Sequence, residues 1–279
     1  MELNFLEGHT TPPGVVSALK RWWSKERDHV TQNPELHVNA SEAGKCLRKV
    51  AYRLYGMSMW PEHVSFPSHI ALEIGSHIHR VIEAAMAEQH DDFEAEVYVK
   101  SGDGGFVSGY ADGVYTVHGK KTVLEIKTVK PWMFNQAVRQ GGSFYDNGLL
   151  QAMIYARLLD AAQVHIVYVN KVPQYGNDDS IAEWFIPLDI DLVDAEMARM
   201  KRTVELVKQG RLPERWHDRR LIEDPDKEGW PCSWCPAKIY CVTQPTGETE
   251  MSMEILETMK RNGDLSDLVD LDEIQQGLA

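Results

Sequence analysis

The chain is expected to form an α/β domain in which a mixed central sheet is flanked by helices. Apolar residues recur at helical spacing over 68–89, and an alternating, strand-like pattern follows over 94–128. Helical and strand-like segments then interchange up to about residue 210. This order of helices, a strand meander, further strands and a last helix predicts a mixed sheet between helices.

Three helices are expected before the first strand. Residues 14–28 look helical, with charge on one side. Residues 41–55 are predicted as a second helix, with Ser41 as its N-cap and Gly56 after its end. The third helix, over 68–89, is predicted from six regularly spaced apolar residues: Ile70, Ile74, Ile78, Val81, Ile82 and Ala85.

The alternating segments predict strands over 94–100, 106–117 and 121–128, the last two joined by a turn at 118–120. The later elements follow from further changes of period: helices at about 131–140 and 148–160, strands at 163–170 and 181–187, and a charged helix at about 189–210. Near the C-terminus, Ile255, Leu256 and Met259 again have helical spacing.

Composition and charge restrict the classes of protein. Of the 279 residues, 43% are hydrophobic, yet no apolar run approaches the roughly 20 residues that cross a bilayer. The first residues lack the basic start and apolar stretch of a secretory signal, so a cytoplasmic protein is expected. The net charge of -13 argues mildly against a nucleic-acid partner, but residues 248–279 alone contribute -7, from nine acidic and two basic residues.

The segment 106–130 places two carboxylates and a lysine on neighbouring strands. Glu125 and Lys127 point to the same strand face while Ile126 faces the core, and a hairpin would bring Asp112 beside Glu125. The two carboxylates and the Ile126 carbonyl are candidate ligands for Mg²⁺ or Mn²⁺, which polarises a phosphate oxygen and activates a water. Lys127 would orient that water or neutralise charge on the phosphate. A Glu–Lys pair on a solvated strand face is the alternative.

Two of the predicted helices carry polar side chains suited to the same site. His79 shares a helix face with Gly75 and Glu83, and a neutral imidazole is a suitable nitrogen ligand for Mn²⁺. Gln151 and Tyr155 are four residues apart, so they reach one point together, near a scissile strand or Lys127. For each helix taken alone, ordinary surface or packed residues are the alternative.

The four cysteines are spaced as metal ligands rather than as disulfides. Cys232, Cys235 and Cys241 form a C-x2-C-x5-C cluster, and Cys46 lies far upstream. Four thiolates on one centre would clamp the C-terminal cluster onto an N-terminal helix by closing a very long loop. An iron–sulfur cluster and a structural Zn²⁺ both fit this spacing.

In their order along the chain, these motifs resemble the iron–sulfur branch of the RecB-like PD-(D/E)XK nucleases. That branch includes the CRISPR-associated RecB-like exonucleases, the AddB nuclease domain and phage-encoded relatives. The resemblance covers residues 41–241 and rests on the following series: Cys46, Gly75-x3-His79, Gly109-x2-Asp112, Glu125-Ile126-Lys127, Gln151-x3-Tyr155 and the three downstream cysteines. Asp112 follows Gly-Tyr-Ala rather than the proline of the family motif, which leaves its role intact.

The resemblance implies a restriction-endonuclease-like core closed by an iron–sulfur knuckle. His79, Asp112 and Glu125 would bind Mg²⁺ or Mn²⁺, and Lys127 would be the catalytic lysine. Gln151 and Tyr155 would form the supporting motif, and Glu96 resembles an acidic position upstream of the central strands. The cysteines would hold a [4Fe-4S] cluster, which the resemblance favours over Zn²⁺.

The resemblance further implies a metal-dependent DNA nuclease, an exonuclease on single-stranded DNA or DNA ends, acting in recombination, replication or end processing. The alternatives are a structure-dependent endonuclease on the same core, and a non-catalytic DNA-binding or scaffold protein with a structural four-cysteine metal site. Trp132 and Phe134 are candidates to stack on bases, and Lys130 and Arg139 to meet phosphates.

Three regions are expected along the chain. Residues 1–40 would form a helical extension, and residues 41–245 the core closed by the four cysteines. Residues 246–279 would be an acidic tail, helical or disordered, that serves a protein partner or self-association rather than DNA.

Overall fold

A computed structural model of the chain describes residues 36–57, 66–102, 104–142, 147–172, 180–215, 232 and 235–261. The helix expected at 14–28 lies outside these ranges. None of the helices within them is long and apolar enough to cross a membrane.

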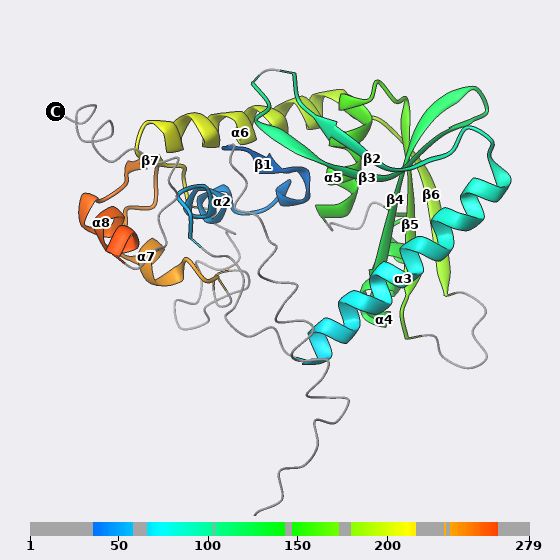
Figure 1. Ribbon diagram of the computed structural model, residues 1–279, viewed down its shortest axis with the longest axis horizontal. Coiled ribbons are helices and arrows are strands. Elements are labelled where there is room, and N and C mark those ends of the chain that lie inside the picture. The colour runs from blue at the N-terminus through cyan, green and yellow to red at the C-terminus, as the bar shows by residue number, and fades with distance from the viewer. Residues whose placement is uncertain are drawn as a thin grey trace, which may run out of the picture.

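A mixed six-stranded sheet stands at the centre of the molecule, as expected (Figure 1). Its strands are β1 (Val38–Asn39), β2 (Glu94–Lys100), β3 (Val107–Val117), β4 (Lys120–Val129), β5 (Gln163–Asn170) and β6 (Ile181–Pro187). The order is β1-β3-β4-β5-β6, and β2 also pairs with β3. β1 runs parallel to β3 and β4 parallel to β5, whereas the other neighbours are antiparallel.

The hairpin of β3 and β4 follows from its turn. His118 and Gly119 both have positive φ, 51° and 74°, as the two central residues of a tight hairpin turn require. Lys120, expected in the turn, already begins β4. Pairing runs from the turn to Gly113 and Leu124, and beyond these two residues the strands no longer pair. The hairpin therefore opens into a fork.

Helices cover both faces of the sheet. α3 (Phe66–Gln89) packs Ile78 and Ile82 on one face, and α5 (Asn147–Leu158) packs on the other (Figure 1). Of the apolar residues from which this helix was predicted, Ile70, Ile74 and Val81 are exposed. A helix with apolar residues on more than one face does not reveal from its sequence which face packs.

Four more elements belong to the part of the chain up to residue 208 and lie outside the sheet. They are the 3-10 helix η1 (Ala40–Glu42), α2 (Leu47–Leu54), α4 (Pro131–Arg139) and α6 (Ile190–Lys208). The single helix predicted over 41–55 is wrong, because η1 and α2 are separate. Gly44 lies between them in a left-handed conformation (φ 67°), and its amide donates to the Glu196 carboxylate of α6 at 2.8 Å.

The C-terminal elements pack into the core rather than forming a separate acidic tail up to residue 261. They are β7 (Arg211–Leu212), α7 (Lys238–Val242), β8 (Thr249–Glu250) and α8 (Met253–Arg261). β8 pairs with β7, and Met251, Leu256 and Met259 are fully buried in the main hydrophobic cluster. Within 249–261 a few apolar residues pack into the core despite the acidic composition, and α8 is helical, which was one of the two forms expected after residue 246.

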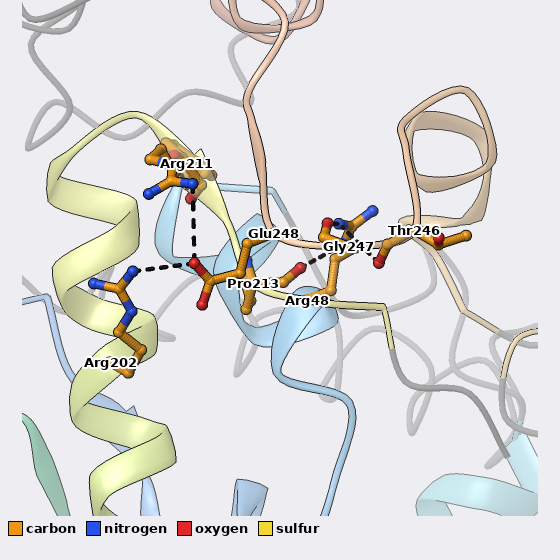
Figure 2. A network of polar contacts seen from close by, with 8 residues as sticks. Arg48, Arg202, Arg211, Pro213, Thr246, Gly247 and Glu248 are labelled. Carbon is orange, nitrogen blue, oxygen red and sulfur yellow. Dashed lines mark hydrogen bonds and ion pairs between the residues drawn. The ribbon is translucent and has the colours of Figure 1, made fainter.

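Arg48 ties α2 to this C-terminal region (Figure 2). Its side chain is fully buried, and it donates to the main-chain carbonyls of Pro213 at 2.7 Å and of Pro245 and Gly247 at 2.5 Å each. Beside it, Glu248 pairs with Arg202 at 3.0 Å. The buried guanidinium of Arg48 thus joins two distant segments, at Pro213 and at 245–247, to α2.

Candidate active site

The fork of the β3–β4 hairpin holds the two predicted carboxylates. Asp112 and Glu125 are the first residues beyond the last pair of the hairpin, Gly113 and Leu124. The Ile126 amide donates to Asp112 Oδ2 at 2.6 Å, so Asp112 bridges the opening between the strands. The expectation that the hairpin brings Asp112 beside Glu125 is confirmed.

A line of polar contacts runs from Glu125 to α5. Lys127 Nζ lies 2.6 Å from Glu125 Oε1 and 3.3 Å from Gln151 Oε1. Gln151 Nε2 in turn donates to the Tyr155 hydroxyl at 3.1 Å. Gln151 thus contacts Lys127, which was one of the two alternatives expected from the helical spacing, and Tyr155 contacts Gln151. The alternative of a solvated strand face is wrong, because Glu125 is only 1% exposed.

His79 enters from α3, on the other side of the fork. Its Nδ1 lies 3.4 Å from Asp112 Oδ1. One turn earlier, a Cβ on Gly75 would stand 3.0 Å from Thr128 Oγ1 of β4. The glycine therefore allows α3 to approach the sheet closely enough for His79 to reach the carboxylates.

Burial and like charge perturb the ionisable groups of the site. Burial raises the pKa of Glu125 to about 7, and the Asp112 charge adds to the rise, while Lys127 and His79 oppose it. For His79 burial lowers the pKa, but the hydrogen bond and charge of Asp112, with Glu125 and Glu83, reverse the effect and raise it. The Glu125 shift thus reflects mainly burial, whereas the His79 shift reflects the carboxylates around the imidazole.

The donors suit a hard divalent cation. Among the described residues, no group of three or more His, Cys, Asp or Glu side chains stands ready to hold a metal ion in this conformation, in which Lys127 engages Glu125 Oε1. Glu125 Oε2, however, is buried and finds no hydrogen-bond partner within that part of the chain. An orphaned carboxylate oxygen beside Asp112 and His79 fits Mg²⁺ or Mn²⁺.

A cleft of about 810 Å³ opens beside these groups, between α3 and the sheet. Its wall includes His79, Arg80, Glu83, Glu96 and Lys171. Burial, then Glu96 and Asp112, raise the pKa of Glu83. Glu96 stands opposite Asp112 in the register of β2 and β3, with a positive φ of 52°. From the sequence, Glu83 could be associated with the site only by its spacing from His79. The positive φ of Glu96 could not be predicted from the sequence.

Sequence reasoning also missed the physical reason for Gly109. A Cβ at Gly109 would lie 2.5 Å from the Tyr155 hydroxyl. The missing side chain on β3 thus makes room for the tyrosine that supports Gln151. The Gly-x2-Asp pattern was visible in the sequence, but the ring that fills the space comes from α5.

The four cysteines come from both ends of the described chain and lie close enough to affect one another electrostatically, although among the described residues they do not form a ready metal-binding group. All four are free thiols, Cys46 at the N-cap of α2 and the others in or before α7. Burial raises the pKa of Cys232, followed by the charges of Cys46, Cys235 and Cys241, so the four are electrostatic neighbours. Four such thiols are a donor set for iron–sulfur or zinc, and a bound cationic centre would relieve their repulsion.

The four residues predicted to contact DNA lie on α4 and at the residue before it. Three of them are exposed and one is buried. Trp132 is 61% exposed, and Lys130 and Arg139 are exposed as well. Phe134 was wrongly predicted to stack on bases, because its ring is buried in the main hydrophobic cluster. Residues two apart on a helix face different ways, so the burial of Phe134 leaves Trp132 outside.

No protein-family model matches the chain. No curated protein matches it. Among solved structures, it is similar to the protein SSO0001, with 21% identity and a TM-score of 0.48 over 84% of this chain and 98% of the other. It is similar to an alkaline exonuclease from Laribacter hongkongensis, with 12% identity and a TM-score of 0.40 over 68% and 96%. It is also similar to a phage-related exonuclease from Haemophilus somnus 129PT, with 15% identity and a TM-score of 0.41 over 57% of this chain and 78% of the other. At such low values, nothing about the chemistry of this chain follows from these likenesses.

Proposed function

We propose that this chain is a metal-dependent DNA nuclease that hydrolyses phosphodiester bonds at the β3–β4 fork. One observation carries the proposal: Glu125 is buried with an unpaired oxygen, beside Asp112 and Lys127. A carboxylate kept in this state at a cost to stability is typical of a functional site. The exposed cleft alongside offers room for a substrate strand.

The residues divide the chemistry among them. Asp112, Glu125 and His79 would hold Mg²⁺ or Mn²⁺, with the Ile126 carbonyl as a further ligand. The bound ion supplies Lewis acidity at the phosphate and a more acidic water. The Lys127 ammonium orients the attacking water and balances the charge that grows on the phosphate oxygens.

Two residues of α5 position the lysine. Gln151 accepts from Lys127 Nζ and donates to the Tyr155 hydroxyl, so the ammonium is held between β4 and α5. Without this support, the long Lys127 side chain would sample other rotamers, and its ammonium group would no longer be held beside Glu125.

Within this activity, we favour an exonuclease on single-stranded DNA or DNA ends, working in recombination, replication or end processing. The preference rests on the resemblance of the motifs, and a structure-dependent endonuclease on the same core is the second candidate. Linear and circular single-stranded DNA separate the two, because an exonuclease leaves the circle intact.

A [4Fe-4S] cluster on Cys46, Cys232, Cys235 and Cys241 belongs to the same proposal, with a structural role. Its support is the gathering of four thiols from both ends of the core. The spectrum of anaerobically purified protein tests it: a broad band near ~400 nm with bound iron supports the cluster, and a colourless zinc-loaded protein overturns it.

The activity is tested with end-labelled single-stranded DNA in Mn²⁺, with chelator as the blank. Lys127→Ala and Asp112→Ala should each abolish cleavage. Lys208→Ala, at the exposed C-terminal end of α6, is the matched control and should cleave normally. Cleavage that survives both site substitutions in clean protein would defeat the proposal.

A further inference from the structure

Two tyrosines form an exposed aromatic pair on the strands that lead to the fork. Tyr98 of β2 and Tyr110 of β3 stand opposite each other, with ring centroids 5.1 Å apart at an angle of 50°. Their residues are 54% and 57% exposed. Large aromatic surfaces left open in adjoining positions are a feature of binding sites rather than of ordinary surfaces.

The strands beneath the pair are held from their other side. Val99 and Ala111, which are next to the tyrosines in β2 and β3, are buried in the main hydrophobic cluster. The fold therefore does not depend on burial of the two rings. Their exposure needs another explanation than packing.

The pair adjoins the candidate active site. Tyr110 precedes Asp112 by two residues on β3, a separation of about 7 Å along a strand. In the other direction Lys100, two residues beyond Tyr98, presents an exposed side chain opposite Ser108. The acidic site at Asp112, the tyrosine pair and the Lys100 ammonium group thus follow one another along β2 and β3.

We propose that Tyr98 and Tyr110 form a stacking platform for unpaired bases of the strand whose phosphate lies at Asp112 and Glu125. The inference rests on the proposed function and names its substrate, a single-stranded segment or a frayed DNA end. An unpaired base offers an open ring face to an aromatic side chain, whereas bases inside a duplex are already stacked and paired. Lys100 meets a phosphate of the same strand.

An aromatic pair next to the acidic site suits a nuclease that selects unpaired ends. The rings hold the bases beside the scissile bond, and the carboxylates and Lys127 act on the phosphate. A blunt duplex cannot use the platform until its end frays. Selectivity for unpaired DNA would therefore come from the tyrosine pair, and hydrolysis from the fork.

Binding of a fluorescent single-stranded oligonucleotide, in chelator so that no cleavage occurs, tests the platform. Tyr98→Ala and Tyr110→Ala should each weaken binding about five- to tenfold, whereas the Phe variants, which keep the ring, should bind within about twofold of the wild type. Binding to a blunt duplex should not change. Phe185→Ala is the matched control, an exposed ring on β6 away from this pair, and should bind normally.

A second readout separates stacking from a structural effect. A 2-aminopurine base near the end of the oligonucleotide should lose fluorescence on the wild type and on the Phe variants, but not on Tyr98→Ala/Tyr110→Ala. Ala variants that bind and quench like the wild type overturn the platform, as does a wild type that does not bind single strands. Tyrosine-dependent binding without any cleavage in Mn²⁺ would support the platform and defeat the nuclease proposal.

Discussion

Glutamine at position 125 keeps the shape of a protonated glutamate but cannot ionise, so E125Q isolates the free energy of burying the charge. In the folded protein, burial raises the pKa of Glu125 from its ordinary value of 4.5 to about 7. Below pH 4.5 the acid is protonated in both folded and unfolded chains, and its charge has no effect on stability. As the pH rises from 4.5 to about 7, the unfolded chain ionises before the folded chain does, so the folded state becomes progressively less stable; above about pH 7 both are ionised and the loss is complete.

The size of the effect follows from the shift. Each unit of pKa corresponds to about 1.4 kcal/mol, so the wild type should lose roughly 3 kcal/mol above pH 8 relative to E125Q. For a chain of this size, that difference raises the melting temperature of the variant by roughly 5–10 °C. The same substitution would remove one of the proposed metal ligands, so the more stable variant should be inactive.

Thermal unfolding in chelator at pH 5 and pH 8 measures the difference, with Glu88→Gln on the exposed surface of α3 as the control. Mn²⁺ should then stabilise the wild type and leave E125Q almost unchanged, because only a site with both carboxylates binds it tightly. If E125Q melts like the wild type at pH 8, or if its advantage is as large at pH 5, the reasoning about a buried charge is refuted.

Three further changes test neighbouring features. Gly109→Ala would push a methyl group against the Tyr155 hydroxyl and lower kcat/KM by roughly 10- to 100-fold, whereas Gly102→Ala, with nothing within 4 Å of its Cβ, should be silent. The raised pKa of His79 favours the protonated imidazole as the pH falls, and a protonated imidazole cannot bind a metal ion. The Mn²⁺ concentration needed for half-maximal activity should therefore rise on acidification. His79→Ala should need more Mn²⁺ at every pH. Arg48→Met would leave the carbonyl of the buried Pro213 unpaired and remove the contacts to Pro245 and Gly247, so it should lower the free energy of unfolding by about 2–4 kcal/mol in chemical denaturation, with the rate per folded molecule unchanged.

The site could be predicted from the sequence because its geometry is mostly local. The alternation of residues and the turn at His118 and Gly119 fix the β3–β4 register, and that register alone brings Asp112 to Glu125. Helical spacing likewise joins Gln151 to Tyr155. Only the docking of α3 and α5 on the two faces had to be assumed.

What the sequence could not supply depends on packing between distant segments. The burial of Phe134 is decided by which face of α4 meets the sheet, and period alone does not choose it. The pKa of Glu125 depends on cover from both layers of helices, so the sequence could not distinguish it from a solvated glutamate. The role of Arg48 could not be predicted from the sequence, because two of its partners are carbonyls almost 200 positions away along the chain.

The Arg48 contacts also bear on what an iron–sulfur cluster would do for stability. The sequence suggested that the cysteines clamp the C-terminal region onto α2. The structure supplies a second clamp, because Arg48 holds Pro213, Pro245 and Gly247, and Met251 is fully buried. These contacts do not involve thiols.

If the proposed cluster is present, its loss in Cys235→Ser should loosen α7 while β8 and α8 stay docked. Hydrogen exchange of the amides in 249–261 measures the docking. Protection there should persist in Cys235→Ser and fall in Arg48→Met, because the guanidinium is the link between α2 and this segment. The opposite ranking, with protection lost in the cysteine variant and kept without Arg48, would mean that the metal centre holds the two ends of the core together and that the arginine only fills space between them.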